Sequence, residues 1–179
     1  MNLLVVDVQP EYSATCTGVA RQLNGLLRKA ARTHGKVLAL FVGGELSPDR
    51  EADVRAYWLT HGVEEHQLSQ VAFLEKGYNF FRGWMDNGVD PGVIVDTAKS
   101  LRDRLCWDST YLAPEELIEL GADPTLETLY MPGCLEGHAP RFEGSRWFTC
   151  GGGVTECLLE TELWMRSRDI AFERTDVVY

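Results

Sequence analysis

Three residues of this sequence carry side chains suited to covalent catalysis and stand at the ends of predicted elements. Asp7 closes a strand-like run at residues 2–8, Lys76 closes another at 70–76, and Cys157 follows three glycines at the start of a predicted helix. A carboxylate can take a proton, a thiolate can attack a carbonyl carbon, and an ammonium group can stabilise the charges that develop. Together these three groups would suit a cysteine hydrolase.

Each of the three residues also has a purely structural interpretation. Asp7 could cap a turn or the following helix, Lys76 could be a surface residue, and Cys157 could be a small buried residue that packs a helix on a sheet. A helix N-terminus, however, favours negative charge and lowers the pKa of a thiol placed there. The residue types alone therefore leave catalysis and structure open at all three positions.

The glycines that precede Cys157 suggest how an oxyanion could be held. Gly152 and Gly153 have no side chain, so backbone N–H groups near them can approach a ligand closely, as in an oxyanion hole. Thr155 lies in the same turn, and Gln9 follows Asp7 by two positions. We expect these four residues to contact the oxyanion or the substrate.

Strand-like and helix-like patterns alternate along the chain. Continuous apolar runs at 2–8 and 37–42 are typical of strands buried on both faces of a parallel sheet, and 70–76 is predicted to be a third strand. The other predicted elements are a helix over 19–30, helices over 49–58 and 80–85, two helical pieces over 91–121, a short strand at 128–131, a strand at 146–150, a helix from 154 and a last strand at 170–179.

This alternation predicts an α/β fold with a doubly wound, mostly parallel β-sheet flanked by helices, a Rossmann-like three-layer αβα arrangement. We expect a single domain over 1–179 with a helical insertion around 91–125. Ligands of such sheets bind beyond the carboxyl ends of the strands. Asp7, Lys76 and Cys157 are therefore expected to converge although they are far apart in sequence.

Composition narrows the classes of protein to consider. The 179 residues are 45% hydrophobic, which allows one sizeable core, and 17 basic against 27 acidic residues give a net charge of −10. That balance disfavours a long surface for nucleic-acid phosphates. The longest apolar run has six residues, at 37–42, and no targeting segment is apparent, so we expect a cytoplasmic protein with no membrane partner. The five cysteines contain no CxxC pair, which favours free thiols in a reducing compartment.

Two segments, LLVVDVQPEY and GGGVTECLLET, resemble the isochorismatase-like cysteine hydrolases, a family that includes nicotinamidases and N-carbamoyl amidohydrolases. The family opens its first strand with D-x-Q followed by an aromatic residue. Lys76 matches the family lysine by position and order, and FERTDVVY is similar to the strand after the family's cysteine-bearing helix. The resemblance is specific at 3–12 and 151–161.

The resemblance implies a reaction and a role for each residue. Asp7 would be the general base, Cys157 the nucleophile, and Lys76 the group that stabilises the thiolate and the developing charge. The reaction would be the hydrolysis of an amide-type C–N bond in a small-molecule substrate, without a cofactor. The four histidines do not form the D-x-H arrangement of nicotinamidases, so no metal is implied. The family tendency also favours a homo-oligomer.

A metal-dependent nuclease of the PIN or NYN type is a second hypothesis. The segment WDSTYLAPEELIELGA is similar to the later acidic motif of NYN domains. Asp7, Asp96 and Asp108 could then gather Mg²⁺, which prefers oxygen ligands. Thr110 stands where the family's second acid is expected, and Asp108 could instead cap a helix.

A third hypothesis is an inert scaffold of the same family that serves binding or assembly. Its partner surface would be a cluster of aromatic residues, namely Tyr78, Phe80, Phe81 and Trp84, which at helical spacing could equally belong to the core. Glu156 and Glu160, one helical turn apart, form an acidic pair that could bind a cation or an amine beside the glycine turn.

Overall fold

A five-stranded, all-parallel sheet runs through the centre of the computed structural model, which describes residues 1–44, 46–76, 81–101, 109–111, 114–119, 128–130, 135 and 137–179. The strand order is β3-β2-β1-β6-β7, so the order reverses between β1 and β6. The strands are β1 Asn2–Val6, β2 Val37–Val42, β3 Val71–Lys76, β6 Trp147–Gly151 and β7 Phe172–Val178. The predicted doubly wound α/β fold class is confirmed.

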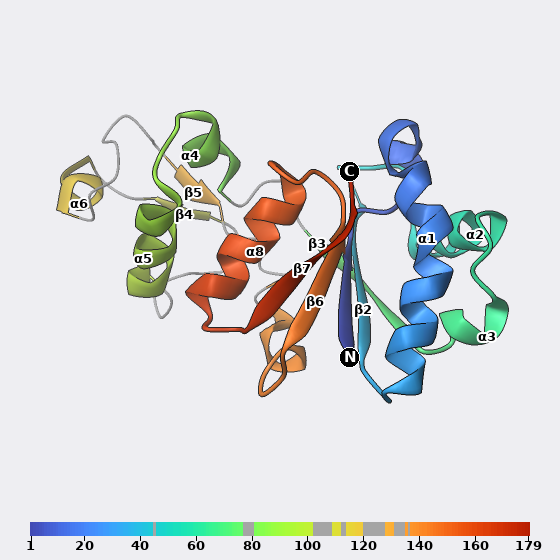
Figure 1. The fold of residues 1–179 in the computed structure, drawn as a ribbon. Helices are drawn as coiled ribbons and strands as arrows, with labels where there is room; N and C mark the ends of the chain where they lie inside the picture. The colour runs from blue at the N-terminus through green and yellow to red at the C-terminus, as the bar shows by residue number, and fades with distance from the viewer. Residues whose placement is uncertain are drawn as a thin grey trace.

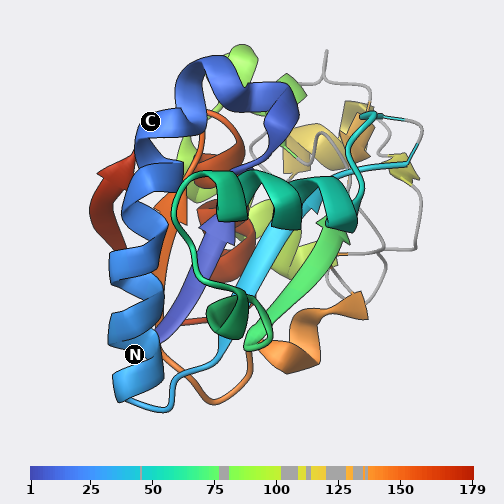
Figure 2. The ribbon, with the colours of Figure 1, turned by 90° about the vertical axis from the view of Figure 1, so that its right-hand side faces the viewer.

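Helices cover both faces of the sheet, as Figures 1 and 2 show. One face carries α1 Ser13–Arg32, α2 Glu51–Thr60 and α3 Glu65–Leu68. The other face carries α8 Cys157–Ser167, with α5 Pro91–Leu101 packed beside it and α4 Arg82–Asp86 close by. Two short 3₁₀ helices, η1 Pro10–Tyr12 and η2 Ala139–Arg141, complete the described connections.

The alternating side chains of β1 explain why its sequence is continuously apolar. Leu3 and Val5 pack into the core under α1, whereas Leu4 and Val6 pack into the core under α8. Successive side chains of a strand point to opposite faces, so a central strand between two helical layers needs apolar residues at every position. This burial on both faces brings the carboxyl end of β1, and Asp7 after it, into the interior.

The predicted helical insertion around 91–125 contains strands as well as helices. The helices α5 and α6 Pro114–Glu119 agree with the prediction, but β4 Ser109–Tyr111 lies between them. It pairs antiparallel with β5 Thr128–Tyr130. The run Ser-Thr-Tyr combines β-branched and aromatic residues that favour a strand. Among the described residues no helix is long and apolar enough to cross a membrane.

Candidate active site

The structure brings Asp7, Lys76 and Cys157 together at the carboxyl edge of the sheet. Asp7 follows β1, Lys76 ends β3, and Cys157 begins α8 just after β6. Because β1 and β6 are the neighbours between which the strand order reverses, the crevice at their ends is where ligands of such sheets bind. The expected convergence of the three side chains is therefore found in the fold.

Asp7 and Lys76 form a buried ion pair. The Lys76 Nζ lies 2.9 Å from an Asp7 carboxylate oxygen, and each side chain is only 1% exposed. Burial alone would lower the pKa of Lys76, but the negative charge of Asp7, the hydrogen bond to Asp7 and the charge of the Cys157 thiolate whenever it forms raise it above its usual value. Lys76 is thus a buried cation held by a carboxylate and not a surface lysine.

The backbone at Asp7 adopts a left-handed conformation with φ 53°. Only glycine, asparagine and aspartate visit this region readily. The Asp7 N–H donates to the Leu40 carbonyl at 3.0 Å, which keeps β1 paired with β2 to its end. The abrupt change of direction after Val6 turns the Asp7 side chain toward Lys76 and Cys157.

Cys157 is half-buried, and its thiol interacts directly with Asp7. Burial raises the pKa of Cys157 to about 12, and the negative charge of Asp7 and its hydrogen bond with the thiol add to this rise, while Lys76 opposes it. The predicted lowering of this pKa by the helix N-terminus is therefore wrong, because burial and a neighbouring carboxylate outweigh it. The resting thiol is protonated at neutral pH, so a base must remove its proton during attack.

The glycines before Cys157 are explained by close packing within the fold, independently of any bound substrate. Gly151 has φ 109°, and a Cβ there would collide with the Val6 carbonyl. A Cβ at Gly152 would collide with the Tyr179 hydroxyl, and the Gly152 N–H donates to the Val6 carbonyl at 2.8 Å. The Gly152 N–H is thus engaged within the fold.

Besides the Gly153 N–H, which has no acceptor among the described residues, the start of α8 offers two backbone N–H groups as candidate oxyanion donors. The N–H groups of Val154 and Glu156 already donate to backbone carbonyls at 3.0 and 2.7 Å. Within the described part of the chain, no acceptor is found for the N–H groups of Thr155 and Cys157. The first N–H groups of a helix have no acceptor inside it, so these two can serve a ligand.

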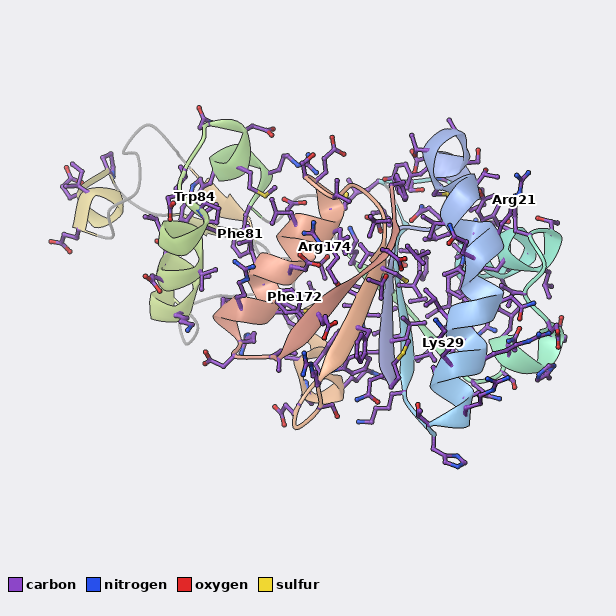
Figure 3. All side chains as sticks on the ribbon, in the orientation of Figure 1. Arg21, Lys29, Phe81, Trp84, Phe172 and Arg174 are labelled. Carbon is purple, nitrogen blue, oxygen red and sulfur yellow. The ribbon has the colours of Figure 1, made fainter. Side chains whose placement is uncertain are left out.

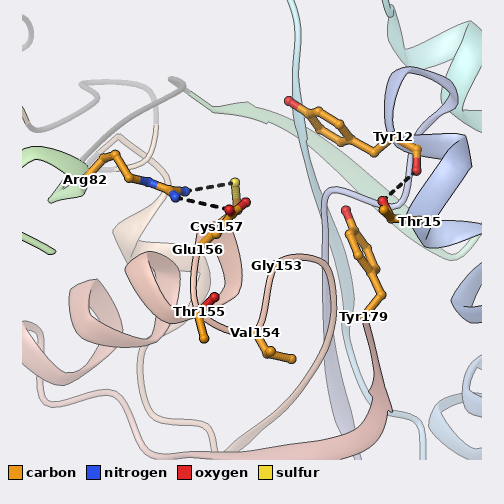
Figure 4. Close-up of a pocket in the computed structure, with 9 residues that line it drawn as sticks. All are labelled: Tyr12, Thr15, Arg82, Gly153, Val154, Thr155, Glu156, Cys157 and Tyr179. Atoms are coloured by element: carbon orange, nitrogen blue, oxygen red, sulfur yellow. Dashed lines mark hydrogen bonds and ion pairs between the residues drawn. The ribbon is translucent and has the colours of Figure 1, made fainter. Parts of the chain in front are cut away.

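Cys157 opens onto a pocket of about 590 Å³ (Figure 4). Gly153 and Thr155 line it, as expected from the sequence. Gln9 does not line it, because its carboxamide joins the ends of β1 and β2. The Gln9 amide nitrogen donates to the Val42 carbonyl and to an Asp49 carboxylate oxygen, both at 3.0 Å, and its oxygen accepts from the Val42 N–H at 2.9 Å.

Arg82 is a pocket residue that sequence reasoning did not single out. Its guanidinium lies 3.9 Å from the Cys157 sulfur, 3.7 Å from a Glu160 carboxylate oxygen and 3.7 Å from a Glu156 carboxylate oxygen. Glu160 is 1% exposed and also accepts from the Phe81 N–H at 3.0 Å. The acidic pair formed by Glu156, just before α8, and Glu160, on α8, therefore does hold a cation, which is the arginine at the start of α4.

Tyr179 is a second residue that sequence reasoning missed. Its hydroxyl donates to the Asp7 carbonyl at 3.0 Å, and its own carbonyl accepts from the Val154 N–H at 3.0 Å. Burial, with the nearby charges of Asp7 and Cys157, raises the pKa of this phenol, so it stays protonated as a donor. Tyr179 thus links the residue that carries the carboxylate to the turn that carries the thiol.

Replacing Tyr179 by phenylalanine should destabilise the protein by roughly 0.5–1.5 kcal/mol, because the Asp7 carbonyl loses its hydroxyl donor while the ring is kept. Urea unfolding monitored by tryptophan fluorescence would measure this change. Thr15→Ala is a matched control, since its hydroxyl donates to the exposed Tyr12 carbonyl at the rim of the same pocket. Equal stability of the Tyr179 variant and the wild type would contradict the bridging role.

The positions of the described acidic residues give little support to the metal-site hypothesis. Asp96 lies exposed on α5, and Asp108 falls outside the described residues. The group beside Asp7 is the Lys76 ammonium. No cluster of three or more histidine, cysteine, aspartate or glutamate side chains suited to a metal ion occurs among the described residues.

The aromatic surface expected for a scaffold is only partly described. Phe81 and Trp84 are each 1% exposed and belong to the core beneath α8 and α5, as Figure 3 illustrates. They offer no surface to a partner. Tyr78 and Phe80 lie outside the described residues.

Comparison with family models, curated proteins and solved structures gives no significant match to this chain.

Proposed function

We propose that this protein is a cysteine hydrolase that cleaves an amide-type C–N bond in a small molecule. The observation that carries the proposal is the buried Asp7–Lys76 pair, 2.9 Å apart, in contact with a thiol that opens onto a pocket. Burying two charges is costly unless they are paired, and placing them against a nucleophile has a direct catalytic use. The resemblance of residues 3–12 and 151–161 to the isochorismatase-like hydrolases supports the same reaction.

The first half of the reaction forms a thioester. The Cys157 sulfur attacks the amide carbonyl carbon while the thiol proton passes to Asp7, and the carbonyl oxygen becomes an oxyanion. The N–H groups of Thr155 and Cys157 would hold that oxyanion, a contribution of about 3 kcal/mol per donor in other enzymes. Asp7 then gives its proton to the nitrogen, the C–N bond breaks, and ammonia or an amine leaves.

The second half returns the enzyme to its starting state. Water attacks the thioester carbonyl and gives a proton to Asp7, the C–S bond breaks, and the proton returns to the Cys157 sulfur. The product is the carboxylic acid. Lys76 lies against the Asp7 carboxylate throughout and offsets the charge on the sulfur whenever the thiolate forms.

The experiment is a screen of small primary amides and N-carbamoyl compounds for release of ammonia by the wild type. Cys157→Ser should reduce the release to the uncatalysed rate. Cys150→Ser is the control, because that thiol is fully buried in the core and no carboxylate of the described residues shifts its pKa. Turnover that survives in Cys157→Ser, or no turnover of any compound by the wild type, would refute the proposal.

A further inference from the structure

Among the described residues, the charges around the pocket do not cancel. Two cations, Lys76 and Arg82, face three carboxylates, Asp7, Glu156 and Glu160. The buried carboxylates account for both cations, since Asp7 holds Lys76 and Glu160 lies against Arg82. Glu156 carries the remaining negative charge.

Glu156 is also the charged group most accessible to a ligand. Its side chain is 59% exposed, against 20% for Arg82 and 1% for the buried groups. Its contact with Arg82 is long, at 3.7 Å, and such exposed pairs contribute little. A ligand in the pocket therefore meets the Glu156 carboxylate as the least compensated charge.

The opposite side of the pocket is aromatic. Figure 4 shows Tyr12 and Tyr179 across Gly153 from the group formed by Cys157 and Glu156. Aromatic faces attract cations, because the ring carries negative charge above its plane. The net charge of −10 adds a long-range attraction for cations and a barrier to anions.

We propose that this pocket selects cationic amides, with Glu156 as the specificity-determining residue. The ligand would be a small carboxamide that carries an ammonium or amidinium group a few bonds from its carbonyl. The carbonyl would lie at Cys157, and the cation would lie between the Glu156 carboxylate and the tyrosine rings. The identity of the reacting group rests on the proposed hydrolase function, whereas the preference for positive charge rests on the pocket alone.

Binding to the Cys157→Ser protein tests the preference without turnover. Three amides of equal chain length serve as probes, namely aminocaproamide, caproamide and the monoamide of adipic acid, which end in an ammonium, a methyl and a carboxylate. Titration calorimetry at low ionic strength should give the smallest dissociation constant for the cation, a larger one for the neutral amide and the largest for the anion. The cation should bind about three- to tenfold more tightly than the anion, as expected for a partly exposed charge pair. The difference should shrink as salt is added.

Substitution of Glu156 tests whether this side chain causes the preference for cationic amides. Glu156→Gln in the same background should remove most of the difference between cation and anion. Glu173→Gln is the matched control, because it removes one exposed negative charge near the amino end of β7, away from the pocket. The control should keep the full difference.

Several results would overturn the inference. Anion binding as tight as cation binding would make Arg82 the recognising group. An unchanged preference in Glu156→Gln, or a loss of preference in Glu173→Gln, would show that the overall charge and not Glu156 decides. Failure of all three probes to bind would show that the pocket does not take amides of this kind. The expected binding order without hydrolysis by the wild type would instead refute the proposed function and leave the inference standing.

Discussion

Replacing Asp7 by asparagine should slow hydrolysis by roughly 10²–10⁴-fold and at the same time make Cys157 easier to ionise. The rate falls because the amide of asparagine cannot accept the thiol proton. The thiolate becomes more accessible because two contributions that raise the pKa of Cys157, the charge of Asp7 and its hydrogen bond, disappear while Lys76 remains. A residue that only shaped the fold would not move these two quantities in opposite directions.

Asparagine is a suitable replacement because it tolerates the left-handed backbone found at position 7. Thiolate absorbance near 240 nm against pH, corrected with Asp7→Asn/Cys157→Ser, would report the titration of Cys157. We expect its midpoint to fall by roughly 1–3 pH units from the wild-type value of about 12. An unchanged or higher midpoint, or hydrolysis at the wild-type rate, would show that Asp7 is not the base.

Replacing Lys76 by methionine should destabilise the protein by about 3–5 kcal/mol, because it leaves the buried Asp7 carboxylate without its cation. Guanidinium unfolding would measure the free energy of unfolding. Lys99→Met is a close control: its ammonium also lies 2.9 Å from a carboxylate, that of Asp169, but the two side chains are 42% and 66% exposed. The control should change stability by less than about 1 kcal/mol.

The direction of the pKa shift at Lys76 determines the pH at which the stabilities of the Lys76→Met and Lys99→Met variants should be compared. The folded protein raises the pKa of Lys76 above its usual value of 10.5, so the pair contributes fully below pH 10.5 and is lost as pH rises through the raised value. At pH 7 the full effect of Lys76→Met is therefore expected. The double variant Asp7→Asn/Lys76→Met should recover much of the loss, because neither charge is then left alone. A single variant as stable as the wild type would mean that the pair is not held as described.

The position of the candidate triad could be predicted from the sequence for a simple physical reason. Runs that are apolar at every position must be buried on both faces, and parallel strands place their carboxyl ends at one edge. Asp7 ends such a run, Lys76 ends a neighbouring strand of the same sheet, and Cys157 follows the strand on the other side of β1. Local patterns were thus sufficient to bring together residues 150 positions apart.

The pKa of Cys157 and the ion pairs around it could not be predicted from local sequence patterns. The expected effect of the helix N-terminus on Cys157 is real in isolation, but it is smaller than the effect of burial and of the Asp7 charge, which only the packed structure supplies. The contact of Arg82 with Glu160 joins elements 78 positions apart through side chains alone. The spacing of Glu156 and Glu160 marked the acidic pair in advance, but no spacing in the sequence marked Arg82 as its cation.

The proposed mechanism requires a covalent bond between the acyl group of the substrate and the Cys157 sulfur. An amide that the wild type hydrolyses would be mixed with excess protein, quenched with acid within the first turnover, and examined by mass spectrometry of the intact chain and of its peptides. We predict an added mass equal to the acyl group of the substrate, located on the peptide that contains Cys157 and absent from Cys157→Ser. Turnover with no such adduct, or an adduct on a different residue, would contradict the account.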